Sequence, residues 1–263
     1  MPYSHQQQAI EFITQRFADD PQVLGLLLSG SIAHSLHSPE SDVDLNIVVS
    51  QEEFDRRLAE TRCTFYEPCG QFYPDGYYDG KFITLDYLKA VAEKGNEPSR
   101  FALHDAKILF DKTGEIAKLQ EAIGDYDKID VPGNTKRFVT QLEGWNWFCG
   151  EALRKNNRYL LNLSVTKLVL FGGRLILMEN RILFPYHKWF LRILADAPKK
   201  PEGLMQAIDQ VINDPTRQHI EHFYQMARNY RPWDVGPDFS WGANFMNDVE
   251  LRWLLGEEMV ENL

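Results

Sequence analysis

Two short apolar runs, separated by a small polar insert, place the strongest constraint on how this chain folds. They are Val23–Leu28 and Val43–Val49, and turn-forming residues flank both. Apolar runs of this length are typical of strands that are buried on both faces. Between them, Ser29-Gly30 ends the first strand and a short helical segment extends to Leu36. The sequence therefore predicts a strand, a short helix and a second strand at the centre of an N-terminal domain.

Helices are expected on both sides of this unit. Ser4 and Gln7 have the spacing of a capping box before apolar residues at helical intervals, and Pro21 ends that helix. Ser50 and Glu53 have the same spacing and predict a helix through Ala59.

The next segment is predicted to contain a tight turn and further strands. Asp79-Gly80 is a dipeptide favoured in tight hairpins, and Phe82–Asp86 is expected to continue as an extended segment. Lys107–Phe110 is a further short strand, followed by a helix to about Ile123.

The chain changes character after residue 124. Gly124–Asn134 is polar, contains Pro132 and Gly133, and is expected to be a hinge. Beyond it no strand pattern is convincing, and apolar residues recur at helical spacing. The prediction is two domains, residues 1–124 and 125–263, the second a helical bundle.

Composition limits the classes of partner. The 263 residues carry 28 Lys+Arg against 38 Asp+Glu, a net charge of −10, which argues against general nucleic-acid binding. A charged substrate therefore needs a local site with a cation. The three cysteines, Cys63, Cys69 and Cys149, lack the spacing of a zinc site and are expected to be free thiols in a reducing compartment.

No membrane segment is expected. The N-terminus lacks the basic and then apolar regions of an export signal. The most apolar stretch, Leu168–Met178, is interrupted by Gly172, Gly173 and Arg174 and is shorter than the ~20 residues that cross a bilayer. We expect a cytoplasmic protein.

Asp42 and Asp44 lead the second apolar run and carry the main chemical signal. Side chains alternate along a strand, so the two carboxylates project from one face, about 6–7 Å apart along the strand. Like charges so placed repel each other, and a hard divalent cation such as Mg²⁺ relieves that repulsion. A two-metal site needs another carboxylate, and Asp86, at the end of the extended segment, is the best candidate.

Gly30 and Ser31 stand where the first strand passes into the short helix. Glycine lets a phosphate approach the backbone closely, and the Ser31 hydroxyl can donate a hydrogen bond to it. Together with the carboxylates, this pair describes a clamp for a nucleoside triphosphate.

The joint pattern of Gly30, Ser31, Asp42 and Asp44 resembles the DNA polymerase beta-like nucleotidyltransferase superfamily, over residues 20–90. The chain looks most like small bacterial enzymes of that group, including aminoglycoside nucleotidyltransferases. The resemblance implies an α+β fold: an N-terminal nucleotidyltransferase domain with a mixed β-sheet and flanking helices, then a C-terminal helical domain that binds the acceptor. By position, the third family carboxylate falls on Asp86.

The same resemblance implies a reaction. Two Mg²⁺ ions would serve transfer of a nucleoside monophosphate, often AMP from ATP, to a hydroxyl group of a small molecule such as an aminoglycoside, with pyrophosphate leaving. Lys167 and Arg174, charged residues within an apolar helical tract, are candidates to touch the triphosphate, although their side chains could instead extend to the surface. Glu143 and Glu151 are weaker candidates for a general base.

Two other functions agree with the same residues. One is a protein-modifying, antitoxin-like nucleotidyltransferase that adenylylates a partner protein. The other is a non-catalytic module that binds a nucleotide without turnover. The size of the acceptor distinguishes the first from a small-molecule enzyme, and the absence of pyrophosphate release would identify the second.

Overall fold

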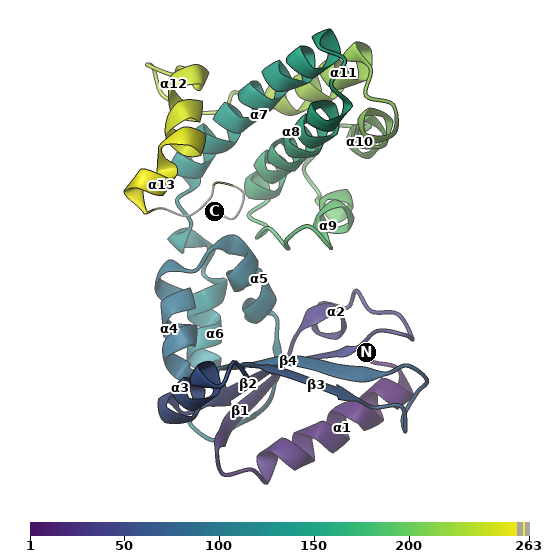
Figure 1. Ribbon diagram of the computed structural model, residues 1–263, viewed down its shortest axis with the longest axis vertical. Helices are drawn as coiled ribbons and strands as arrows, with labels where there is room; N and C mark the ends of the chain where they lie inside the picture. Colours follow the sequence, from purple (N-terminus) through teal and green to yellow (C-terminus); the bar gives the residue numbers. More distant parts are fainter. Residues whose placement is uncertain (257–259, 261–263) are drawn as a thin grey trace. The chain divides into compact units, whose positions relative to one another are not determined.

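The computed structural model describes residues 1–256 and 260, and the chain divides into two compact units, Met1–Asp125 and Tyr126–Leu263. The first unit is a mixed sheet with helices, and the described part of the second is helical (Figure 1). The α+β fold class that the sequence predicts is confirmed.

The first unit alternates strands with helices. Its elements are α1 (Ser4–Ala18), β1 (Val23–Leu28), α2 (Gly30–Ala33), β2 (Val43–Val49), α3 (Gln51–Ala59), β3 (Thr64–Pro68), β4 (Tyr77–Ile83), α4 (Leu85–Lys94), α5 (Glu97–His104), β5 (Lys107–Asp111) and α6 (Ile116–Gly124).

The five-stranded sheet has the order β3-β4-β2-β1-β5. β2 pairs antiparallel with β1 and parallel with β4, while the outer strands β3 and β5 are antiparallel to their neighbours. In the parallel pair, Asp44 is the register partner of Asp79 and Val48 is the partner of Ile83. This pairing sets which side chains of β2 and β4 lie side by side.

The two faces of the sheet differ because side chains alternate along each strand. One face packs against α1 in a core that includes Ile13, Leu45 and Ile47. The other face packs against α4, α5 and α6 through Val48 and Ile83 (Figure 1). Asp42 and Asp44 belong to the second face of β2, so their carboxylates point away from α1.

The structure corrects the predicted hairpin at Asp79-Gly80, which lies inside β4. The chain turns earlier, in the loop before Tyr77. A Cβ on Gly80 would lie 3.0 Å from the Leu45 carbonyl oxygen, so this glycine allows β4 to pack closely on β2. A glycine inside a strand often marks such a close approach.

The predicted extension to Asp86 is also wrong. β4 ends at Ile83, the Thr84 hydroxyl accepts a hydrogen bond from the Tyr87 backbone N–H, and α4 begins at Leu85. Asp86 therefore lies in the first turn of a helix, where an acidic side chain interacts favourably with the helix dipole.

The boundary between the two units falls within Gly124–Asn134, the predicted hinge, and part of this segment is helical. Tyr126–Lys128 forms a 3₁₀ turn, and Pro132 and Gly133 lie in the first turn of α7. The Asp130 carboxylate caps this helix by accepting the Gly133 N–H at 3.0 Å. Proline is favoured in a first helical turn, where its missing N–H leaves no bond unmade. The residues that suggested a hinge therefore begin a helix.

The described part of the second unit is built on two long helices, α7 and α8, with shorter helices after them. They are α7 (Val131–Arg154), α8 (Arg158–Glu179), α9 (Phe190–Asp196), α10 (Leu204–Asn213), α11 (Arg217–Arg228), α12 (Trp241–Phe245), the π-helical turn η2 (Met246–Glu250) and α13 (Arg252–Leu255).

Helix α8 is the core of this unit. By length and composition it could cross a membrane, but 67% of its most apolar window is buried inside the protein. The central helix of a folded domain has the same properties. Phe171, Leu175 and Ile176 are fully buried there among residues of α7, α10 and α11.

Arg100 in α5 is the largest buried charge in the first unit that the structure describes, with 1% of its surface exposed. Its guanidinium donates to the carbonyls of Ala92 and Gly95 at the end of α4 and of Ile123 near the end of α6. A cation is favourable at helix C-termini, where carbonyl groups lack helical partners. Arg100 therefore ties three helices together.

Replacing Arg100 by methionine is expected to destabilise the protein by about 3 kcal/mol, because it leaves three carbonyls without their donor. The midpoint of urea unfolding measures this. Arg154→Met, at an exposed ion pair with Glu151, is the control and should shift the midpoint little. Equal shifts in both variants would contradict a structural role for Arg100.

Candidate metal and nucleotide site

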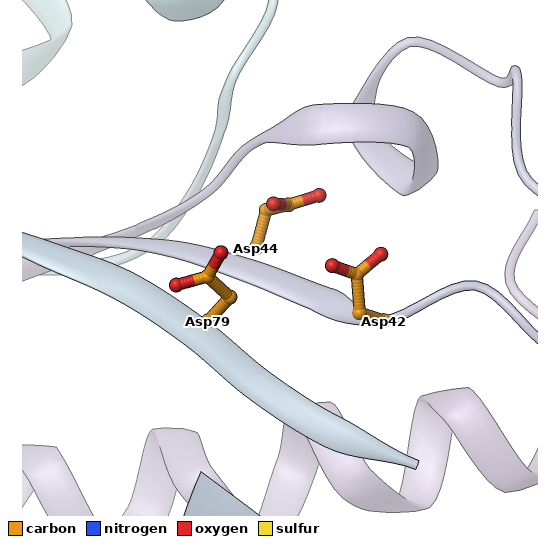
Figure 2. Close-up of side chains that lie close together, drawn as sticks. All are labelled: Asp42, Asp44 and Asp79. Carbon is orange, nitrogen blue, oxygen red and sulfur yellow. The ribbon is translucent and has the colours of Figure 1, made fainter. Parts of the chain in front are cut away.

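Three carboxylates meet on the sheet face away from α1. One oxygen each of Asp42, Asp44 and Asp79 lies within 4.8 Å of the other two. Figure 2 shows Asp44 on β2, Asp42 just before that strand and Asp79 on the neighbouring strand, all directed toward the helical turn above them. The first two side chains are half-buried and the third is exposed.

The strand register explains why these residues meet. Asp44 and Asp79 are partners across the parallel pair, and Asp42 is two residues before Asp44 on the same face. Apolar residues on the opposite face of β2 hold the strand in the core. The three carboxylates are therefore positioned by main-chain pairing rather than by a flexible loop.

Gly30 packs directly on this cluster. Its φ is +61°, and a Cβ built on it would lie 1.7 Å from Asp44 Oδ2 and 2.3 Å from Asp44 Cγ. Any other residue would therefore have to displace the carboxylate as well as adopt a left-handed backbone. The Ser29 N–H donates to the Asp44 carbonyl at 2.9 Å and holds this turn against β2.

Ser31 follows with its side chain buried. Only 4% of the residue is exposed, and its Oγ has no hydrogen-bond partner among the residues that the structure describes. A buried hydroxyl without a partner costs free energy, so such a group points to a ligand or an ordered water.

Tyr77 lies close enough to the carboxylates for their negative charges to shift its pKa. Its pKa is raised, first by the negative charge of Asp42, then by burial, and then by its hydrogen bond to Asp42. The charges of Asp79 and Asp44 act in the same direction. The phenol therefore lies in the combined negative field of the three carboxylates.

The donor set fits a hard divalent cation. Two unit charges 4 Å apart repel by about 4 kcal/mol at an effective dielectric constant of 20, and a cation between them reverses that energy. All the donors are oxygens, which Mg²⁺ prefers, and opposite ligands of an octahedral Mg²⁺ are about 4.2 Å apart. At most one pair among three ligands can be opposite, and neighbouring ligands are about 3 Å apart, so an ion would draw these oxygens, which lie within 4.8 Å of one another, closer together.

The structure brings together Asp42 and Asp44, as the sequence predicts, but not Asp86. About 13 Å of strand separates Asp79 from Ile83, and Asp86 lies beyond that. Its side chain is 73% exposed and pairs with Lys89 Nζ at 3.3 Å. The assignment of Asp86 as the third carboxylate is corrected: the residue that joins the pair is Asp79.

The other predicted nucleotide ligands belong to the second unit. Lys167 is half-buried in α8, and its contact with a triphosphate stays a prediction. Arg174 is 1% exposed, with its guanidinium 4.4 Å from the ring centroids of both Phe138 and Phe184. Burial between two rings gives Arg174 a place in the core of that unit.

The two candidate general bases are held in ion pairs. Glu143 accepts from Tyr224 Oη at 2.6 Å and from Arg228 Nε at 2.8 Å. Glu151 accepts from Arg154 at 2.6 Å, and this hydrogen bond is the main cause that lowers its pKa to about 2. A carboxylate with so low a pKa is a poor base near neutral pH, which argues against Glu151.

His34, which follows α2, is part of the packing beneath the site. Its ring stacks on Phe101 of α5 with centroids 4.3 Å apart. Burial lowers its pKa, against the opposing charge of Asp105. A neutral, stacked imidazole helps to fix α2, and through it Gly30, against the rest of the unit.

Comparison with known proteins finds a distant structural likeness and no matching family model. No protein-family model matches the chain, and no curated protein matches it. Among solved structures, the chain is similar to a nucleotidyltransferase-like protein from Exiguobacterium sibiricum 255-15, with a TM-score of 0.46 and 9% identity over 96% of this chain and 81% of that one. A likeness this distant transfers no function from that protein to this one.

Proposed function

We propose that this protein is a Mg²⁺-dependent nucleotidyltransferase that transfers a nucleoside monophosphate, AMP from ATP, to a hydroxyl group and releases pyrophosphate. The observation that carries this proposal is the cluster of Asp42, Asp44 and Asp79 against the Gly30 turn. Three converging carboxylates are an all-oxygen donor set of the kind that a hard divalent cation binds.

The residues of the chain divide into two tasks. Asp42, Asp44 and Asp79 would hold one or two Mg²⁺ ions and so place the α-phosphorus of the nucleotide. Gly30 leaves room for phosphate oxygens beside the main chain, and Ser31 Oγ supplies a donor that is otherwise unused. Bound ions would neutralise the triphosphate and lower the pKa of the acceptor hydroxyl.

The proposed reaction is a displacement at the α-phosphorus of the nucleotide. The acceptor oxygen forms a bond to the α-phosphorus as the bond from that phosphorus to the bridging oxygen of pyrophosphate breaks. Pyrophosphate leaves with the electron pair, and the acceptor hydroxyl gives up its proton to solvent. The carboxylates take no part in the proton transfer in this scheme, because their task would be to hold the ions and so orient the reacting groups.

Mg²⁺-dependent ATP binding and turnover test this function. Isothermal titration with ATP should give saturable binding in Mg²⁺ and none in EDTA. A panel of ATP, GTP, CTP and UTP, screened against aminoglycosides, lincosamides and other alcohols, should give pyrophosphate with at least one acceptor. Asp44→Asn, which keeps the shape of the side chain, is the matched inactive control.

The same panel separates the alternatives. A blank small-molecule screen with AMP added to a partner protein would indicate a protein acceptor. Binding of Mg²⁺ and ATP with no pyrophosphate from any acceptor would indicate a module that only binds nucleotide. Failure to bind either Mg²⁺ or ATP would refute the proposal.

A further inference from the structure

A cavity of about 730 Å³ lies beside the carboxylate cluster, wholly within the first unit. The N-terminal end of α1, the loop before β2 and the loop between β3 and β4 form its walls. Its volume is in the range of pockets that bind small molecules.

The cavity is joined to the site through two tyrosines. Tyr77 lines it and lies close enough to Asp42 for the charge of that carboxylate to raise the pKa of its phenol. Tyr73 lines it as well and donates to the carbonyl oxygen of Ser41, the residue before Asp42, at 3.0 Å. A ligand in this cavity would therefore lie next to the carboxylates.

Phe72, Tyr73 and Tyr77 form an aromatic wall of the cavity, and contacts within the protein hold the Tyr73 part of it in place. A Cβ on Gly76 would lie 2.7 Å from the Tyr73 ring, so the ring rests directly on the backbone of its own loop. The Cys69 N–H donates to the Gly76 carbonyl at 2.7 Å and closes that loop. The His5 ring packs 4.8 Å from the Tyr73 ring. The wall is therefore formed before any ligand binds.

The charged lining residues are acidic. They are Glu40 and Asp75, both exposed, and neither lysine nor arginine is among the described residues that line the cavity. Carboxylates beside aromatic faces attract a cation and repel phosphate. The acidic lining disfavours a triphosphate in this cavity, which leaves the cavity for the acceptor.

Two hydrogen-bonding groups of the wall are engaged already. The Tyr73 hydroxyl donates to the Ser41 carbonyl oxygen at 3.0 Å, and His5 Nε2 contacts the Pro39 carbonyl oxygen at 2.8 Å. A polyhydroxylated sugar would find few hydrogen-bond donors here, because neither lysine nor arginine is among the described lining residues. An ammonium group with alkyl substituents needs only ring faces and a nearby carboxylate.

We propose that this cavity binds the acceptor and that the acceptor is an alcohol bearing an alkylated ammonium group, its hydroxyl directed toward Asp42. This inference rests on the proposed function, because only a transferase has an acceptor. The binding site itself can be tested without nucleotide or metal. It places acceptor recognition in the first unit, whereas the sequence predicts it in the helical domain.

Choline and its uncharged isostere 3,3-dimethylbutan-1-ol provide the direct test. In a ¹H–¹⁵N titration of the metal-free protein, choline should give saturable shifts at the amides of Phe72, Tyr73 and residues 75–77, with roughly tenfold higher affinity than the isostere. Equal affinities, or an absence of saturable shifts, would overturn the proposal and leave the Mg²⁺ and ATP test untouched. Tighter binding of kanamycin at the same amides would overturn it in favour of a sugar acceptor.

Asp75 provides the matched variants. It has a φ of +57° at the third position of a turn in which the Gly76 N–H donates to the Tyr73 carbonyl, a position that suits glycine. Asp75→Gly should therefore raise the melting temperature while it weakens choline binding roughly fivefold. Asp75→Asn should weaken binding equally without the gain in stability. Unchanged choline affinity in both variants would contradict the inference.

Discussion

Asp79→Asn is expected to reduce pyrophosphate release to background and to weaken Mn²⁺ binding, measured by electron paramagnetic resonance, roughly a hundredfold or more. The change keeps the shape of the side chain and removes one of three converging charges. It should not destabilise the metal-free protein, because it also removes repulsion from Asp42 and Asp44. Loss of metal affinity without loss of stability is the result that separates a metal ligand from a structural residue.

Asp86→Asn is the matched control for that variant. Its carboxylate is exposed in the first turn of α4 and pairs with Lys89. Mn²⁺ affinity and pyrophosphate release should stay at the level of the unmodified protein. An inactive Asp86→Asn protein beside an active Asp79→Asn protein would restore the assignment made from sequence and contradict the site described above.

The comparison of Asp86 with Asp79 shows where sequence reasoning succeeds and where it stops. Asp42 and Asp44 could be recognised because both belong to one strand, and period-two alternation places them on one face without any knowledge of partners. The third carboxylate comes from another strand, so its identity depends on the register between β2 and β4. Register follows from packing over the whole sheet, which a local pattern does not contain.

Asp79 was also obscured by the glycine that follows it. Asp-Gly is a strong turn signal in isolation, and here tertiary packing overrides it, because Gly80 lies against Leu45 inside a strand. One signal could have found the residue: Tyr77, Asp79 and Lys81 alternate with the apolar-face residues Tyr78 and Phe82. That alternation is typical of a strand rather than of a turn.

The strands β1 and β2 and the helical character of the second unit were predictable because apolar periodicity is local. The edge strand β3 was not, since its burial alternates weakly and only its pairing with β4 defines it. Helices α4 and α5 follow one another after a strand that ends earlier than expected. Arg100 links these helices from a buried position. In the sequence it resembles a surface residue, and its role is identified only by the carbonyl groups to which it donates.

Gly30→Ala is expected to have the second large effect. The new methyl group would overlap Asp44 Oδ2 and Cγ, at 1.7 and 2.3 Å, so either the turn or the carboxylate must move by more than 1 Å. A displacement of that size at a reacting centre costs roughly a hundredfold in rate. Pyrophosphate release should fall by roughly 10²- to 10³-fold, and Mn²⁺ affinity should fall with it.

Gly114→Ala isolates the part of this effect that comes from the backbone alone. Gly114 has a φ of +73°, close to the +61° of Gly30, but an added Cβ would meet no described atom within 4 Å. Both variants carry the cost of a left-handed alanine, about 1 kcal/mol. Only Gly30→Ala also introduces the clash with Asp44. Only this variant should therefore lose metal affinity, and its loss of stability in urea unfolding should exceed about 1 kcal/mol. Equal losses would mean that the Gly30 turn does not rest on Asp44.

A double variant shows whether Asp44 itself is the obstacle. Asp44→Ala removes the two atoms nearest to the added methyl group, whereas the next nearest, the Asp44 Cβ at 2.7 Å, remains. In that background the stability cost of Gly30→Ala should fall toward the cost measured at Gly114, because contacting residues are not additive. Such coupling would establish that one glycine is required by one carboxylate, and that the turn and the metal ligands form a single site. Additive costs would indicate instead that Gly30 is required only by its own backbone conformation.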